Sequence, residues 1–435
     1  MKDENTLYWI WLAERCGVAS RAFGRLIVKH GDPFELYRMD EEEIEHIEGI
    51  DARMKEKLCD KSLDSAYSIL RYCKNQDVDI LSYADARYPQ RLRNIEDPPV
   101  LLYAMGRLPD LNRRLCVGMV GTRKMSEYGK ESAYRIAYEA ASVGAVIVSG
   151  MALGIDGIAA CGALEAGGET VAVLGCGMGV VYPKEHKRLM SAITRNGVVL
   201  TEYPPMTRPN GYHFPQRNRI ISGLCQGTLI VEGAKGSGAL ITAAHAIAQG
   251  RELFALPGQV DESNSDGPND LIRQGAHVAL CAEDILHFYD FLYGDVLNYA
   301  TLKKAKVHSA LSPSVLERYG VAVSDMGSAE KKKEPSEKVS RREKNFPKKD
   351  SEDVHKNEKV TKTKKEALAD LSGELLATLD ESVRRIFESL PMDRAVTPDA
   401  LVAQGFDIGT VMTALTTLEI YGLISSLPGG MYMRR

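Results

Sequence analysis

The chain has 435 residues, of which 44% are hydrophobic and 26% charged, and its formal net charge is −4. These values are typical of globular proteins and exclude collagen-like, wholly disordered and membrane-embedded chains. No stretch approaches the roughly 18 consecutive apolar residues that a membrane span needs. The first residues, MKDENT, lack the basic and then apolar pattern of a secretory signal, so we expect a cytoplasmic protein.

The eight cysteines include no C-x-x-C pair, which is a spacing that zinc sites use. In a reducing cytoplasm such thiols stay free. We therefore expect unpaired cysteines, and neither a metal nor another cofactor.

Residues 1–75 are expected to form a small helical module of the SAM or helix–hairpin–helix kind. Apolar residues recur there at helical spacing, and glycines interrupt them at intervals that suit short connections. Residues 44–51, with the sequence IEHIEGID, are typical of a helix–hairpin–helix turn, whose glycine lets backbone amides approach a phosphate. A turn that only packs against its neighbours is the alternative.

Residues 76–295 alternate short runs of valine, isoleucine and leucine with helical patterns. Continuous apolar runs of this length suit strands that are buried on both faces, and their alternation with helices favours a parallel, doubly wound α/β sheet. Ligands of such sheets bind at the carboxyl ends of the strands. The turns that follow the predicted strands are therefore the candidate sites.

Residues 296–367 are expected to form a disordered charged linker. Between Lys331 and Glu366 there are 14 Lys and Arg residues and 8 Asp and Glu residues, which gives a net charge of +6. Mixed charge with few apolar residues does not support a packed core. The segment serves either as a solvated tether or as a weak electrostatic contact with DNA.

Residues 368–435 are expected to form a winged-helix-like domain, because helical patterns precede a glycine-containing hairpin. Such domains often place a helix in a DNA groove. The candidate recognition helix at residues 411–422, VMTALTTLEIYG, contains no Lys or Arg. Protein binding or packing is therefore as compatible with the sequence as DNA recognition.

Two turns in the middle segment offer backbone amides to a phosphate at the end of a predicted strand. Gly121, Thr122 and Arg123 lie between a strand and a helix, and the Arg123 guanidinium supplies two further donors. Ser149 and Gly150 follow the next strand and offer a hydroxyl and an amide. An exposed arginine on a tight turn is the alternative for Arg123.

Other candidates follow later strands. Asp156 is expected to cap a helix, with the stabilisation of a neighbouring loop as the alternative. Lys184 either meets a phosphate or stays in solvent. A further candidate lies just before a predicted helix. There Gly236, Ser237 and Gly238 form a flexible loop that suits an anion, and Lys235 adds a positive charge. Its lysine precedes the glycines, unlike that of a P-loop, so ATP hydrolysis is not expected.

The strongest pattern is FPQRNRIISGL at residues 214–224. An aromatic residue followed by two guanidinium groups suits single-stranded nucleic acid, with Phe214 stacking on a base and Asn218 reaching a base edge or the backbone. Arg217 and Arg219 neutralise phosphates in this interpretation. In the alternative interpretation, one of the arginines pairs with a carboxylate such as Glu202 or Glu232 and stabilises the sheet edge.

Catalytic motifs are less evident in this sequence than the phosphate-binding turns. The sequence contains no HExxH motif and no GxSxG elbow, and its histidines are scattered. Several phosphate-binding turns without a reacting group favour binding over catalysis, so we expect a protein that is not an enzyme.

Several motifs occur in one order: VGTR at residues 120–123, SGMALGID at 149–156, FPQRNRIISGL at 214–224 and GSGALITA at 236–243. This set resembles the DNA-processing protein A family of bacteria, called DprA or Smf. The resemblance covers residues 76–295 and implies a Rossmann-like fold that binds single-stranded DNA without strong sequence preference. It also implies a homodimer that loads the RecA recombinase during natural transformation and recombination.

The resemblance assigns roles to individual positions. It implies a DNA pocket formed by basic side chains and phosphate-binding turns: Arg123, Lys184, Arg217, Asn218, Arg219, Ser149, Gly150, Gly236, Ser237 and Gly238. It places Leu271 and Ile272 in a segment that serves a dimer or partner surface. The chain departs from the family pattern at Ala160, where family members usually have a histidine.

Two rival functions carry sequence signals of their own. Phosphoribohydrolases that act on nucleoside monophosphates have a related sheet, but their PGGxGTxxE signature has no match here. A transcription regulator that acts through residues 368–435 is the other rival, and the missing basic residues on its candidate recognition helix count against it.

Overall fold

The computed structural model describes residues 2–321, 380–391, 396–420, 423–427 and 431–434. The chain divides into two compact units, Met1–Ala329 and Glu330–Arg435, and each is described here by itself. Within the described residues, no helix combines the length and the apolar character that crossing a membrane requires.

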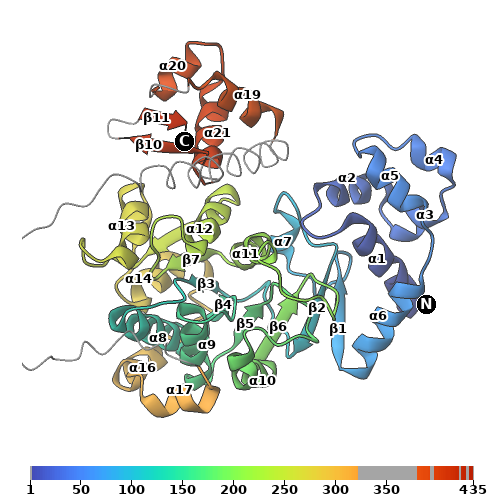
Figure 1. The fold of residues 1–435 in the computed structure, drawn as a ribbon. Coiled ribbons are helices and arrows are strands. Elements are labelled where there is room, and N and C mark those ends of the chain that lie inside the picture. Colours follow the sequence, from blue (N-terminus) through green and yellow to red (C-terminus); the bar gives the residue numbers. More distant parts are fainter. Residues whose placement is uncertain (1, 322–379, 392–395, 421–422, 428–430, 435) are drawn as a thin grey trace, which may run out of the picture. The chain divides into compact units, whose positions relative to one another are not determined.

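Six helices occupy the first 75 residues, as the apolar spacing predicts (Figure 1). They are α1 (Lys2–Cys16), α2 (Arg21–His30), α3 (Pro33–Arg38), α4 (Glu41–Glu45), α5 (Ala52–Cys59) and α6 (Asp64–Asn75). In the predicted hairpin, Ile44 and Ile47 are buried, and Arg25 donates a hydrogen bond of 2.7 Å to the carbonyl of Gly49. These are packing contacts, and a phosphate contact of this turn stays a prediction.

A nine-stranded sheet follows, in the order β1-β2-β6-β5-β4-β3-β7-β8-β9. Its strands are β1 (Val78–Ser82), β2 (Leu101–Gly106), β3 (Cys116–Val120), β4 (Val146–Ser149), β5 (Thr170–Val173), β6 (Gly197–Thr201), β7 (Gly227–Ile230), β8 (Glu252–Ala255) and β9 (His277–Val278). The strands from β3 to β9 pair in parallel, whereas β1 pairs antiparallel with β2 and β2 with β6. The prediction of a mostly parallel sheet is confirmed.

Helices cover both faces of this sheet and form two cores. The first core contains apolar residues of α8 (Glu127–Ser142), α9 (Ile155–Glu165), α10 (Lys187–Asn196), α14 (Ala282–Leu286) and the N-terminal helices. The second core contains residues of α7 (Gln90–Arg93), α11 (His213–Leu224), α12 (Gly238–Ala248) and α13 (Asp266–Arg273). A sheet covered on both faces explains the continuous apolar strands and is the doubly wound arrangement that the alternation predicts.

The prediction of a disordered linker over residues 296–367 is wrong at its beginning. Residues 302–308 form α16 (Leu302–His308), and residues 313–319 form α17 (Pro313–Tyr319). Leu302, Val315 and Val321 are buried in the first core. These few apolar residues are enough to hold the two short helices in place, because the helices on this face of the sheet already form an apolar surface against which they pack. Residues 322–367 of the predicted linker lie outside the described residues.

The second unit contains α19 (Glu381–Ser389), α20 (Pro398–Val402), α21 (Ile408–Ile420) and an antiparallel hairpin of β10 (Ile424–Leu427) and β11 (Met431–Arg434). Helices followed by a hairpin confirm the expected winged-helix character. Val411, Leu415 and Leu418 of α21 are buried in the core of this unit. These three apolar residues of the candidate recognition helix therefore pack inward. Residues 421–422 lie outside the described residues.

Candidate nucleic-acid interface

A groove of about 760 Å³ opens at the carboxyl ends of β3 and β7. From β3 the chain proceeds to β4, β5 and β6 on one side, and then returns to place β7, β8 and β9 on the other. Two loops that leave neighbouring strands in opposite directions create a crevice, which is where ligands of doubly wound sheets bind. The turn of residues 121–124, the start of α11 and the start of α12 line this groove.

Arg123 and Phe214 lie together in the groove. The Arg123 guanidinium is exposed and its central carbon lies 5.5 Å from the centre of the Phe214 ring. The ring of Tyr182 lies 5.3 Å from that of Phe214. Neither Arg123 nor the neighbouring Lys124 pairs with a carboxylate among the described residues. The groove therefore presents two available cations beside an aromatic surface.

Gly121 lets the loops after β3 and β7 approach each other. A Cβ atom at this position would lie 2.6 Å from Cγ1 of Ile155 and 3.0 Å from the carbonyl oxygen of Glu232. The amide of Thr122 donates to the same Glu232 carbonyl over 2.8 Å. Gly121 and Thr122 line the groove as predicted, but the Thr122 amide is already bonded and is not available to a phosphate.

The N-terminus of α12 forms the opposite side of the groove. Ser237 and Gly238 line it. The amide of Leu240 donates to the Ser237 carbonyl over 3.0 Å, which leaves the amides of Gly238 and Ala239 as the ones at the start of this eleven-residue helix without an acceptor in the preceding turn. Such a helix end attracts anions through its partial positive charge. Gly236 has a φ of +75°, a left-handed conformation that favours glycine in this turn. Lys235 does not line the groove and pairs instead with Asp270 at 3.4 Å.

Ser149 and Gly150 do not offer their donors to a phosphate, which corrects the sequence prediction. The buried Ser149 hydroxyl donates to the carbonyl of Met119 over 2.7 Å, and the Gly150 amide donates to the carboxylate of Asp156 over 3.0 Å. Asp156 is therefore not the N-cap of α9, which is Gly154, and the alternative that it stabilises a neighbouring loop is confirmed. The two donors that the sequence suggested for a phosphate are thus both used within the protein.

Arg217 lies at the wall of the groove, but its side chain is buried. Its guanidinium donates to the carbonyl of Val173 and occupies the space that a Cβ at Gly150 would need. Burial raises the pKa of the Asp156 carboxyl, and the Arg217 charge partly offsets this rise. Among the described residues Arg217 forms no close ion pair, and its buried guanidinium donates to the Val173 carbonyl near the carboxylate of Asp156.

Arg219 does not belong to the groove, and its predicted DNA contact is wrong. It is only 1% exposed, and it forms ion pairs with Glu202 at 2.6 Å and with Asp97 at 3.2 Å. The alternative that an arginine pairs with Glu202 is the one that the structure bears out. Successive helical residues are about 100° apart, so Arg217 and Arg219 point in different directions from α11.

Asn218 lies between them and lines the groove. Its side-chain amide donates to the carbonyl of Gly238 over 3.2 Å, which links α11 to α12. The residue is half-buried, so its side-chain oxygen is the part that remains for a ligand.

Lys184 is exposed in a short 3₁₀ turn (η1, Lys184–His186) and is not among the residues that line the groove. Leu271 is 8% exposed and packs in the second core, and the role of its segment at a dimer or partner surface stays a prediction. Ile272 is half-buried against the same core, and its role in a dimer stays a prediction. Ala160 is 2% exposed within α9.

Sequence reasoning did not select Lys124 or Asn264, which both line the groove. Lys124 directly follows Arg123, and this adjacency was a usable signal. Asn264 comes from the segment after β8, and its amide donates to the carbonyl of Lys124 over 2.9 Å. Nothing in the sequence indicates that segments 140 residues apart meet here.

The comparisons with known proteins agree with this fold. A family model described as DNA recombination-mediator protein A matches residues 79–290, and one described as DprA winged helix domain matches residues 363–430. The chain is 41% identical to the DNA processing protein DprA of Bacillus subtilis over 217 residues, which cover 50% of this chain and 73% of that protein. This chain belongs to the DprA/Smf family.

Two solved structures of DprA proteins are also similar to this family member. The X-ray structure of DprA from Streptococcus pneumoniae is 35% identical, with a TM-score of 0.57, and the match covers 65% of this chain and 97% of that chain. DprA from Helicobacter pylori, described with a unique single-stranded DNA binding mode, is 32% identical with a TM-score of 0.45, over 50% of this chain and 96% of that chain.

Proposed function

We propose that this DprA/Smf family member binds single-stranded DNA in the groove between β3 and β7, without strong sequence preference. The observation that carries the proposal is the pair of available cations, Arg123 and Lys124, beside the ring of Phe214. Cations that follow the backbone and an aromatic surface for bases are the two elements of sequence-tolerant single-strand binding.

The position of Phe214 favours a single strand over a duplex. Its ring is half-buried between Tyr182 and Arg123, so only an unpaired base can reach it. In a duplex the bases are stacked on one another, and flipping one out costs a few kcal/mol. The N-terminus of α12 faces the same groove and supports a phosphate contact there.

We also propose that the protein acts in the cytoplasm as a non-enzymatic recombination mediator, as a homodimer that loads RecA. Family membership supports this part of the proposal. It is tested by following RecA filament assembly on single strands coated with a single-strand binding protein. Assembly that is no faster with the protein than without it would contradict the loading role, and a monomer by light scattering would contradict the dimer.

Replacing Arg123 by alanine is expected to weaken single-strand binding roughly tenfold or more, because hydrogen bonds to charged groups contribute about 1.5–3 kcal/mol. The slope of log K against log salt is expected to fall by about 0.7 for the lost phosphate contact. Fluorescence anisotropy of a labelled dT oligonucleotide across a salt series measures both quantities.

Arg113→Ala is the matched control, because Arg113 is exposed and does not line the groove. Its affinity and salt slope are expected to equal those of the unmodified chain. If Arg123→Ala and Arg113→Ala bind alike, or if the chain prefers duplex DNA, the proposed function is wrong.

A further inference from the structure

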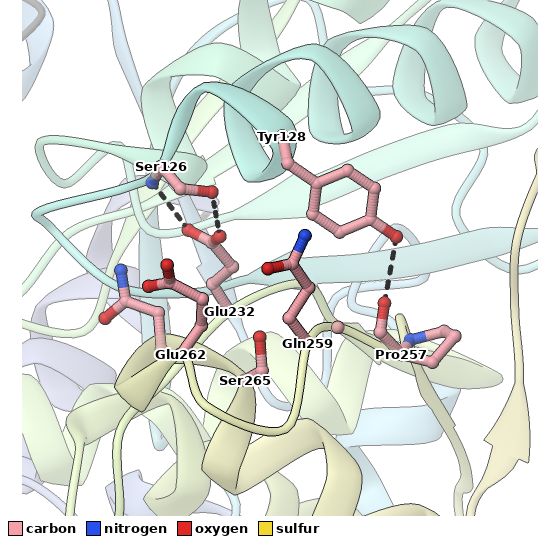
Figure 2. A pocket seen from close by; sticks show the side chains of 9 residues that line it. Ser126, Tyr128, Glu232, Pro257, Gln259, Glu262 and Ser265 are labelled. Atoms are coloured by element: carbon pink, nitrogen blue, oxygen red, sulfur yellow. Dashed lines mark hydrogen bonds between the residues drawn. The ribbon is translucent and has the colours of Figure 1, made fainter.

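A second pocket, of about 440 Å³, lies next to the groove and is not explained by phosphate binding. Asn264 lines both cavities, and the loop that carries Arg123 and Lys124 continues into the second pocket at Ser126. Figure 2 shows this pocket, with α8 above it and the segment after β8 below. Its volume lies within the range of about 300–1,000 Å³ that small-molecule sites have.

One side of the pocket is an aromatic ring held in a fixed position. Tyr128 is 48% exposed, and its hydroxyl donates to the carbonyl of Pro257 over 2.8 Å. The first turn of α8 fixes the other end of the side chain. A fixed and exposed ring is a stacking surface that loses little conformational entropy when a planar group binds.

The opposite side carries polar groups that have no partner in the part of the chain that the structure describes. Ser265 is only 6% exposed, yet its hydroxyl has no hydrogen bond there, and Figure 2 shows it directed into the pocket. The side chains of Gln259 and Glu262 are exposed and extend into the same space, so their polar atoms are accessible to a ligand (Figure 2). Side-chain donors and acceptors that are not used within the protein and that face a pocket are the ones that a ligand can bind.

Glu232 is buried at the back of the pocket and differs from Glu262 in its contacts. Both of its carboxylate oxygens accept from Ser126, one from the amide over 2.9 Å and the other from the hydroxyl. Glu232 thus fixes the loop of residues 121–126, while Glu262 keeps both carboxylate oxygens for a ligand.

The charge of the pocket selects the kind of group that it accepts. Its lining contains two carboxylates, Glu232 and Glu262, and neither Lys nor Arg. It therefore repels phosphate, unlike the adjacent groove, and favours a neutral, planar group that donates hydrogen bonds. In a nucleotide that group is the base.

Among the DNA bases, guanine fits a free carboxylate best. Its Watson–Crick edge carries two adjacent donors, N1–H and the N2 amino group, which match the two oxygens of one carboxylate. Cytosine and adenine place an acceptor next to their amino donor, and thymine has a single donor between two carbonyls. A carboxylate would face an acceptor in each of those cases.

We propose that this second pocket is a guanine subsite of the single-strand groove, with the base stacked on Tyr128 and its Watson–Crick edge on Glu262. The proposal rests on the proposed function, because Arg123 and Lys124 would hold the phosphate of the same nucleotide. It adds a local preference at one position to binding that is otherwise insensitive to sequence.

The test compares the affinity of the full chain for a dT tract with its affinity for the same tract carrying one central dG. The single dG is expected to tighten binding about tenfold, within the range that a bidentate base contact provides. Deoxyinosine at this position lacks the N2 amino group and is expected to lose most of that gain. Glu262→Gln is expected to remove the preference for dG while leaving the affinity for the dT tract unchanged.

Asp261→Asn is the matched control, because it removes the same charge from the neighbouring exposed residue, which does not line the pocket. It is expected to keep the preference for dG. An equal affinity for both tracts, with dT binding that still depends on Arg123, would overturn the subsite and leave the proposed function intact. Loss of dT binding itself would contradict the proposed function, and a dG preference that disappears with EDTA would assign the pocket to a cation instead.

Discussion

Replacing Arg219 by leucine is expected to lower the free energy of unfolding of the first unit by about 3–5 kcal/mol, without a specific loss of DNA affinity in the folded protein. The substitution leaves Glu202, which is 8% exposed, as a buried carboxylate without its cation. Glu202 also accepts from the amide of Ala19 over 3.3 Å, so its ionised form connects the N-terminal helices to the sheet. Urea denaturation measures the loss.

The stability defect of Arg219→Leu is expected to shrink as the pH falls. Burial raises the pKa of Glu202 in the folded state, and Arg219 partly lowers it. Without Arg219 the folded-state pKa rises further, so the variant binds a proton in a pH range where the unmodified protein has lost it. Its relative stability therefore falls as the pH rises through that range. Urea denaturation at several pH values follows this change.

Arg273→Leu provides the control for this experiment. Arg273 pairs with Asp270 at 2.5 Å, but its side chain is 71% exposed, and exposed pairs contribute at most about 1 kcal/mol. An Arg219→Leu variant that is as stable as Arg273→Leu, yet binds DNA weakly, would restore the interpretation of Arg219 as a DNA contact.

Replacing Arg217 by methionine is the second substitution with a large expected effect. Methionine keeps most of the buried volume but removes the guanidinium that donates to the Val173 carbonyl and the charge that partly offsets the burial of Asp156, so we expect a loss of about 1–3 kcal/mol in the free energy of unfolding. Asp156 accepts the Gly150 amide, and the loop after β4 depends on this contact. Thermal and urea denaturation of the full chain report the change.

A second variant separates the charge effect from simple loss of packing. Adding Asp156→Asn to Arg217→Met removes the uncompensated carboxylate, so the double variant is expected to be more stable than Arg217→Met alone. If the two substitutions lower the stability additively, the interaction between Arg217 and Asp156 does not carry the effect.

The sequence was sufficient to predict the parallel sheet, because apolar runs of four or five residues and the helices between them follow directly from burial on both faces. It was also sufficient to find the turn at Arg123, which follows a strand. It could not tell Arg217 from Arg219, because the direction of each side chain depends on where α11 begins and on how the helix packs. A single residue of difference in that start moves each side chain by about 100°.

The same limit applies to Ser149 and Gly150. Their residue types suit a phosphate site, but their donors are used by Met119 and Asp156. Competition between internal and external acceptors is decided by three-dimensional neighbours that local sequence does not show. The helices α16 and α17 were missed for the opposite reason, since their few apolar residues pack on a surface that is formed more than a hundred residues earlier.

The small number of available cations in the groove has a kinetic consequence. Because the Arg217 side chain is buried, Arg123 and Lys124 are the exposed cations among the residues that line the groove. A strand held at so few phosphates dissociates rapidly from one copy at physiological salt. In the proposed homodimer, the second groove would rebind the strand before it diffuses away, because a strand held by one groove is at a high effective concentration for the groove linked to it. Residence time is then set by the length of the strand.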